Sequence, residues 1–228
     1  MMKKALIIVA HPDDEVLGMG GTIAKLTERG VETHLLIVTD GSSSQYKGAA
    51  DLDSIIEKKK TETKESCAIL GIRSVTYGNL PDMKLDTLPH VEINAVVEGA
   101  IRSIRPDTVF THFYGDVNLD HQLVFRSVMV ACRPLSGQCV RAVYCFENPS
   151  STEWNAVSPQ TVFIPNYFVN IGDQLETKLL ALSCYRTELR AYPHPRSIEH
   201  IEKVNVAEGI KLGLPAMERF LMIRQLDD

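Results

Sequence analysis

Imidazole and carboxylate side chains that could share a metal ion lie close together near the start of the chain, in the stretch Ala10-His11-Pro12-Asp13-Asp14-Glu15. An apolar run from Ala5 to Val9 precedes this stretch, and a helical pattern begins near Val16. The stretch is therefore predicted to lie between the end of a strand and the start of a helix. Open α/β sheets bind their ligands at such junctions.

The spacing of His11 and Asp14 suits a shared cation. If Pro12 occupies the first helical position, the two side chains lie one turn apart and can face the same point. Their donor atoms suit zinc or a similar divalent ion, whose catalytic sites usually take three protein ligands. Asp13 would point elsewhere, near enough to contact a metal-bound water. The alternative is that the carboxylates only stabilise a helix N-terminus, by about 0.3–1 kcal/mol.

A second group of polar residues, from His112 to His121, follows another predicted strand. Because parallel strands end at one edge of a sheet, this group can meet the first, and His121 is the expected third ligand. Asp116 and Asp120 are expected to orient the ligands, since metal-bound histidines usually donate their other N–H to an oxygen. The alternative is an ordinary turn at Asp116 and Asn118 with His121 starting a helix. Two such clusters at one edge favour the metal site.

Strands and helices alternate along the first half of the chain, which predicts a mostly parallel, doubly wound α/β sheet with helices on both faces. The predicted strands are at 6–9, 33–39, 75–77 and 108–111. The predicted helices are at 15–29, 51–70, 91–104 and 122–132. The C-terminal third adds predicted strands at 139–146, 166–171 and 218–226 and helices at 173–190 and 199–212. These elements are expected to complete a single domain over residues 1–228.

A glycine cluster, Gly18-Met19-Gly20-Gly21, lies within the first predicted helix. It is not a dinucleotide fingerprint, because GxGxxG would need glycine at Ile23 and would begin in the turn before the helix. We expect these glycines to allow close approach between helix and sheet, at a cost in helix propensity of roughly 1 kcal/mol each.

The bulk composition is that of a mildly acidic globular protein, with 24 Lys and Arg against 29 Asp and Glu and a formal net charge of −5. The longest basic run, Lys58-Lys59-Lys60, lies among glutamates on a predicted helix, which indicates a solvated face and not a nucleic-acid site. The apolar run after Met1-Met2-Lys3-Lys4 is too short for export or for a membrane span. The expected location is the cytoplasm.

The five cysteines show no CxxC spacing, and each is expected to be a small core residue in a reducing compartment; they are Cys67, Cys132, Cys139, Cys145 and Cys184.

Three loops outside the two clusters are candidates for substrate contact. The polar loop from Asp40 to Ser44 follows the second predicted strand, at the same edge as His11. The only tryptophan, Trp154, lies in a loop and could either stack on a ring of the substrate or anchor that loop in the core. In Tyr192-Pro193-His194-Pro195-Arg196-Ser197, His194 or Arg196 could reach the substrate or a phosphate attached to it, and the alternative is a rigid turn.

Ala10 to Glu15, Thr39-Asp40-Gly41 and Asp116 to His121 together resemble the signature of the zinc-dependent N-acetylglucosaminyl deacetylases, the LmbE-like or PIG-L-like family. The resemblance spans roughly the first 135 residues. It implies a Rossmann-like fold, metal ligation by His11, Asp14 and His121, Zn²⁺ or another divalent metal such as Fe²⁺, and Asp13 as the general base. The implied substrate is an N-acetylated amino sugar, free or attached to a glycan, lipid or nucleotide.

Asn118 departs from the family pattern, because many relatives carry histidine there to stabilise the tetrahedral oxyanion. Asparagine still donates a hydrogen bond but cannot act as an acid, and His194 is one candidate for the missing proton donor. Three other functions stay open: a metal-dependent hydratase of an unsaturated acid, a non-catalytic sugar-binding protein, and a dinucleotide-binding enzyme, which the missing fingerprint disfavours. The sequence leaves the oligomeric state open.

Overall fold

The computed structural model describes residues 2–42 and 51–227. Within these residues seven strands form one sheet in the order β3-β2-β1-β4-β5-β7-β6. The strands are β1 (Lys4–Val9), β2 (Glu32–Thr39), β3 (Ser74–Leu80), β4 (Thr108–His112), β5 (Ala142–Phe146), β6 (Tyr167–Asn170) and β7 (Met217–Gln225). The first five run parallel, whereas β7 pairs antiparallel with β5 and with β6. The predicted mostly parallel sheet is confirmed.

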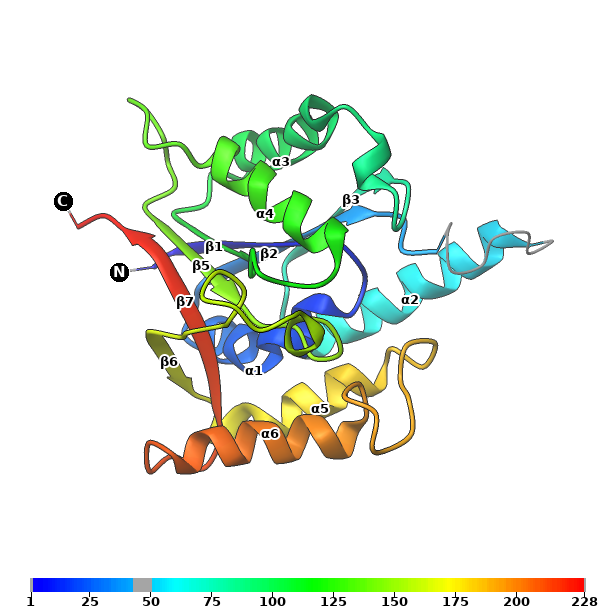
Figure 1. Ribbon diagram of the computed structural model, residues 1–228, viewed down its shortest axis with the longest axis vertical. Helices are drawn as coiled ribbons and strands as arrows, with labels where there is room; N and C mark the ends of the chain where they lie inside the picture. The colour runs from blue at the N-terminus through cyan, green and yellow to red at the C-terminus, as the bar shows by residue number, and fades with distance from the viewer. Residues whose placement is uncertain (1, 43–50, 228) are drawn as a thin grey trace.

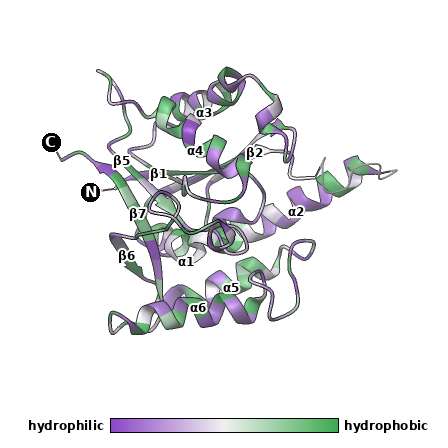
Figure 2. Ribbon diagram, in the orientation of Figure 1, coloured by the Kyte–Doolittle hydropathy of each residue, from purple (hydrophilic) through white to green (hydrophobic). Residues whose placement is uncertain are grey.

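Helices cover both faces of this sheet (Figure 1). They are α1 (Asp14–Glu28), α2 (Leu52–Leu70), α3 (His90–Ile104), α4 (Leu119–Ala131), α5 (Leu175–Ser183) and α6 (Ile198–Ile210). Helices α3 and α4 pack together on one face, and α1, α2 and α5 pack together on the other. Green and purple bands alternate along α3, α5 and α6 in Figure 2, as expected of helices that cover a sheet with one side.

Alternate side chains of β1 enter two separate cores. Ile7 and Val9 pack with Val16 of α1, whereas Leu6 and Ile8 join the core beneath α3 and α4. All these side chains are fully buried. The continuous apolar run that predicted a doubly covered strand therefore has a direct cause, because both faces of a central parallel strand lie against helices.

Helix α1 is kinked at Met19, whose φ is −150°. A Cβ atom on Gly18 would lie only 2.2 Å from the Phe146 ring, so glycine is needed where the helix meets β5. The expected role of the glycine cluster is confirmed at this position. The break leaves backbone groups of the helix unpaired, and side chains from the C-terminal third satisfy them: Lys178 Nζ donates to the Leu17 carbonyl oxygen at 3.0 Å.

Four local predictions are wrong. Lys59, in the basic run that was expected on a solvated face, is only 3% exposed and is paired with Glu188. Pro12 is not the first helical residue, because Asp13 takes a left-handed conformation (φ 94°) and the helix begins at Asp14. The helix predicted at 173–190 ends at Ser183, since the following turns carry Tyr185 and Glu188 into buried contacts. Cys139 is only partly buried, at the rim of one core, whereas the other four cysteines are buried as expected.

No helix in the described part of the chain is long and apolar enough to cross a membrane.

Candidate active site

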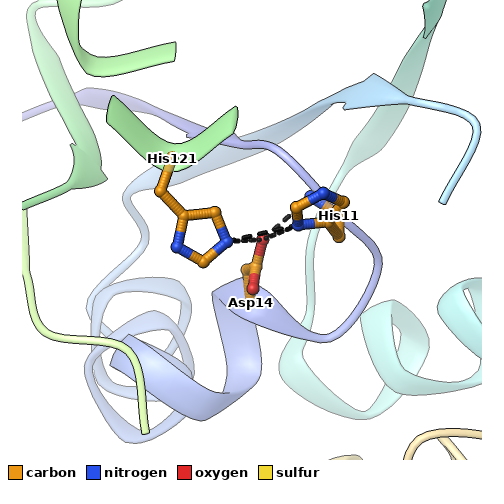
Figure 3. Close-up of side chains that lie close together, drawn as sticks. All are labelled: His11, Asp14 and His121. Carbon is orange, nitrogen blue, oxygen red and sulfur yellow. Dashed lines mark hydrogen bonds and ion pairs between the residues drawn. The ribbon is translucent and has the colours of Figure 1, made fainter. Parts of the chain in front are cut away.

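The ends of β1 and β4 bring the two polar clusters together at one edge of the sheet. His11 follows β1, Asp14 is the first residue of α1, and His121 lies in the first turn of α4. Figure 3 shows the three side chains pointing toward one another from these elements. The left-handed turn at Asp13 allows the His11 main-chain N–H to donate to Asp14 Oδ2 at 2.8 Å.

The three side chains offer one donor atom each in a nearly equilateral triangle. The edges are His11 Nδ1 to His121 Nε2, 3.2 Å, His11 Nδ1 to Asp14 Oδ2, 3.3 Å, and His121 Nε2 to Asp14 Oδ2, 3.4 Å. Atoms bound at 2.0–2.1 Å around a tetrahedral ion lie roughly 3.3–3.4 Å apart. The spacing and the donor chemistry therefore fit a zinc-like divalent ion, with one coordination position left for water or substrate.

Carboxylates hold the second ring nitrogen of each histidine. His121 Nδ1 lies 3.2 Å from Asp116 Oδ2, and His11 Nε2 lies 3.3 Å from both Asp120 Oδ2 and Asp82 Oδ1. This arrangement is typical of metal-ligating histidines, because the carboxylate fixes the ring and its tautomer. His11, Asp82 and Asp120 could also hold an ion among themselves, but they supply a single imidazole.

The charges around the triangle are strongly coupled. Burial lowers the pKa of His121, but the Asp14 and Asp116 carboxylates outweigh this effect and raise it to about 9. Burial raises the pKa of Asp14, but the charge of His121 and the hydrogen bond with His11 hold it well below its ordinary value. The structure therefore combines a carboxylate favoured in its ionised form with an imidazole that readily carries positive charge.

Sequence reasoning missed three residues that complete this shell. Asp82 contacts His11, the Asn148 Nδ2 amide donates to Asp14 Oδ1 at 2.7 Å, and His112 stacks on His121 with ring centroids 3.8 Å apart. Burial and the neighbouring His121 charge lower the pKa of His112 to about 4, so its neutral Nε2 accepts from the Ala10 N–H. All three residues end or follow a strand at this edge, which is the signal that could have identified them.

Asp13 is nearly fully buried beside the triangle. Its Oδ2 atom lies 3.5 Å from Arg196 Nη1, which also lies 3.2 Å from Glu188 Oε2. Glu188 Oε1 is in turn 2.7 Å from the buried Lys59 Nζ. This row of alternating charges reaches Asp13 from α2 and from the turns between α5 and α6. Arg196 therefore lies at the site, where it meets the charge of Asp13, and its contact with a substrate stays a prediction.

A cavity of about 520 Å³ opens over these groups and is also lined by Asn118. Asn118 caps α4 by accepting from the Asp120 N–H at 2.9 Å, and its Nδ2 lies 3.5 Å from Met83 Sδ. Within the described ranges, neither Asp40 nor His194 lines the cavity. Asp40 Oδ1 accepts from Ser42 N–H at 2.9 Å, and His194 Nδ1 accepts from Arg196 N–H at 3.0 Å.

The rest of the loop predicted at Asp40 to Ser44 falls partly outside the described residues, since Ser43 and Ser44 are not among them. Trp154 does not line the 520 Å³ cavity, and the residue is 56% exposed.

Comparison with known proteins matches residues 6–132 to the family model described as PIG-L, GlcNAc-PI de-N-acetylase. The diacetylchitobiose deacetylase of Thermococcus kodakarensis is 30% identical over 193 residues, 82% of this chain and 70% of that protein. A 4-oxalmesaconate hydratase of Pseudomonas putida is 26% identical over 203 residues, 80% of this chain and 72% of that protein.

The fold also resembles the crystal structure of N,N'-diacetylchitobiose deacetylase from Pyrococcus horikoshii, with a TM-score of 0.79, 24% identity and coverage of 98% of this chain and 84% of that one. The family match extends over more than half of the chain and includes both polar clusters. The chain therefore belongs to the PIG-L family.

Proposed function

We propose that this protein is a metal-dependent hydrolase that removes the N-acetyl group from an N-acetylated amino sugar, or from a conjugate of one, and releases acetate. The observation that carries the proposal is the triangle of two imidazole nitrogens and one carboxylate oxygen, with 3.2–3.4 Å edges, next to the buried Asp13. The deacetylase relative at 30% identity supports an amino-sugar substrate.

The proposed ligands are His11, Asp14 and His121, and the proposed ion is Zn²⁺, with Fe²⁺ as the alternative. When bound, such an ion polarises an amide carbonyl and lowers the pKa of water from 15.7 to around 7. Asp116 and Asp120 hold the two rings in the orientation that presents a nitrogen to the centre of the triangle. Asp14 is held likewise by the amide of Asn148.

Asp13 is the proposed general base, because its carboxylate lines the cavity without belonging to the triangle. It accepts a proton from the attacking water, and Arg196 keeps the carboxylate facing the cavity. Asn118 lines the same cavity, and its proposed role is to donate an amide N–H to the oxygen that gains negative charge as water adds to the carbonyl. Since His194 does not reach this cavity, protonated Asp13 is the group best placed to return the proton to the leaving nitrogen.

The direct test is acetate release from N-acetylglucosamine and diacetylchitobiose by Zn²⁺-loaded protein and by Asp13→Asn. The variant should retain its metal content and lose at least about 100-fold in rate, the scale of general acid-base catalysis. The matched control is Asp86→Asn at an exposed site, which should leave the rate unchanged. Normal turnover by Asp13→Asn would contradict the proposed mechanism.

A hydratase is the second candidate, supported by the relative of that name at 26% identity. The same panel separates the two functions, because a hydratase consumes an unsaturated acid without releasing acetate. Turnover of unsaturated acids with no acetate from any N-acetylated sugar would favour hydration. Binding of sugars without turnover of either class would favour a non-catalytic protein.

A further inference from the structure

A second cavity, of about 320 Å³, shares a wall with the candidate active site. The wall is the segment from Glu147 to Trp154, which follows β5. Different residues of this segment line the two cavities. Those in the candidate active site are Asn148, Ser150 and Ser151, and those in the second cavity are Glu147, Pro149, Glu153 and Trp154. The proposed hydrolysis assigns no role to the residues of this second cavity.

Each charged side chain of the second cavity already has a partner within the protein. The Glu153 carboxylate accepts from the main-chain N–H groups two and three residues before it, at 3.2 and 2.6 Å. Lys178 Nζ lies 2.7 Å from Glu218 Oε1, and both side chains are buried. Arg219 bridges two carboxylates, with Nε 2.9 Å from Glu147 Oε1 and Nη1 2.8 Å from Glu208 Oε2. A charged ligand would have to displace one of these partners. The lining therefore favours a neutral ligand.

The rest of the lining combines apolar surfaces with polar ring groups that make no hydrogen bond within the described residues. Trp154, Pro149 and Pro195 supply flat apolar surfaces, and the Trp154 ring is held against that of His194 at 83°, with centroids 6.0 Å apart. Within the described part of the chain, neither the Trp154 indole N–H nor the His200 ring makes a hydrogen bond. A ligand that matches this lining has an apolar face and hydroxyl groups around its edge, as a sugar ring does.

We propose that the second cavity binds a neutral, hexopyranose-sized sugar unit, stacked on Trp154 and hydrogen-bonded to His200. A volume of about 320 Å³ lies at the lower end of the range of small-molecule pockets, roughly 300–1,000 Å³, which favours a single ring. The bound sugar would lie against the wall that carries Asn148. The inference is independent of the proposed deacetylation, because none of these contacts involves the triangle or Asp13.

Trp154 is the only tryptophan in the chain, so intrinsic fluorescence reports on this cavity directly. The probe is methyl β-glucoside, a neutral sugar with no N-acetyl group, titrated into the full chain and followed by fluorescence and by calorimetry. We expect a saturable change in Trp154 emission that persists when a chelator has removed bound metal. No saturable change by either method would overturn the proposal.

Two variants locate the bound sugar. Val204→Phe fills the cavity from α6 and should abolish the change, whereas Ala207→Phe, at an exposed position of the same helix, should leave it intact. His200→Ala keeps the packing and should weaken binding by roughly three- to tenfold, the loss expected for one hydrogen bond. Binding that survives both Val204→Phe and His200→Ala, or a cavity that takes p-cresol but not the glucoside, would refute a sugar site.

Discussion

Glu15 carries a buried charge whose cost should be measurable as a pH-dependent loss of stability. It is fully buried in the first turn of α1, next to Asp14. Its Oε1 atom accepts from the Tyr185 hydroxyl at 2.5 Å, and in the part of the chain that the structure describes Oε2 has no hydrogen-bond partner. Burial raises the pKa of Glu15 from 4.5 to about 7 against the opposing effect of the Tyr185 hydrogen bond.

The size of the effect follows from that pKa. The difference between 4.5 in the unfolded chain and about 7 in the folded protein corresponds to roughly 3 kcal/mol. The folded state binds the proton more tightly, so ionisation of Glu15 costs nothing below pH 4.5, where both states are protonated. As the pH rises from 4.5 to 7 the unfolded chain ionises first, and the free energy of unfolding falls. Above pH 7 the full cost is present.

Glu15→Gln isolates this contribution, because glutamine still accepts the Tyr185 hydrogen bond but never ionises. We would measure urea unfolding of both proteins in the presence of a chelator. The free energy of unfolding of the variant, relative to that of the wild type, should increase by roughly 3 kcal/mol between pH 4.5 and pH 7.5. The control is Glu202→Gln, at an exposed site inside α6, for which the difference from wild type should stay flat. If the wild type and Glu15→Gln lose stability in parallel, burial does not control the charge of Glu15.

Two further predictions concern the metal and the base. Zn²⁺ binding to chelator-stripped protein at pH 7 should release protons and tighten as the pH rises, because the neighbouring carboxylates outweigh burial and raise the pKa of His121 to about 9. Calorimetry in buffers of different ionisation enthalpy measures this release, and an affinity independent of pH would contradict it. Arg196→Ala should retain its metal and lose about 100-fold in kcat, because a reacting group misplaced by an ångström costs about that much. Addition of guanidinium should restore activity to this variant. Arg186→Ala is the control, and a loss confined to KM would instead assign Arg196 to substrate binding.

The site residues that directly follow strands could be predicted from the sequence because a strong physical rule applies to them. Buried parallel strands have continuous apolar runs, and the polar residue that ends each run must lie at one common edge. This rule identifies His11, Asp14 and His121 from the sequence alone. The same rule applies to Asp82 and Asn148, but they follow strands whose ends are less sharply marked, and asparagine or aspartate in such loops usually forms a turn.

The row of charges around Asp13 could not be predicted, because it depends on where α5 ends. Helical spacing continues to Arg190, whereas the chain leaves the helix after Ser183. Turns then place Tyr185 beside Glu15 and Glu188 between Lys59 and Arg196. Helix propensity is a weak preference of the backbone, and buried hydrogen bonds and ion pairs made with distant segments override it.

The C-terminal third also determines the shape of the helix that starts the site. The Glu218 carboxylate accepts from the main-chain N–H groups of Gly21 (3.0 Å) and Thr22 (2.6 Å), while Lys178 Nζ donates to the carbonyl oxygen of Leu17. These contacts supply hydrogen-bond partners to main-chain groups on both sides of the kink at Met19. They hold the first turn of α1, which carries the carboxylates, at an angle that a straight helix would not have.

This arrangement explains why the motif identified the proposed ligands and their supporting aspartates but not the contacts made by the C-terminal third. The family match covers residues 6–132, which contain the whole triangle and both of its supporting aspartates. Asn148, Glu188 and Arg196 lie beyond it, and so do the two side chains that satisfy the kink. The proposed ligands thus follow from short, local spacings, whereas the orientation of Asp13 and Asp14 depends on contacts more than 130 residues away, such as that of Asn148 with Asp14.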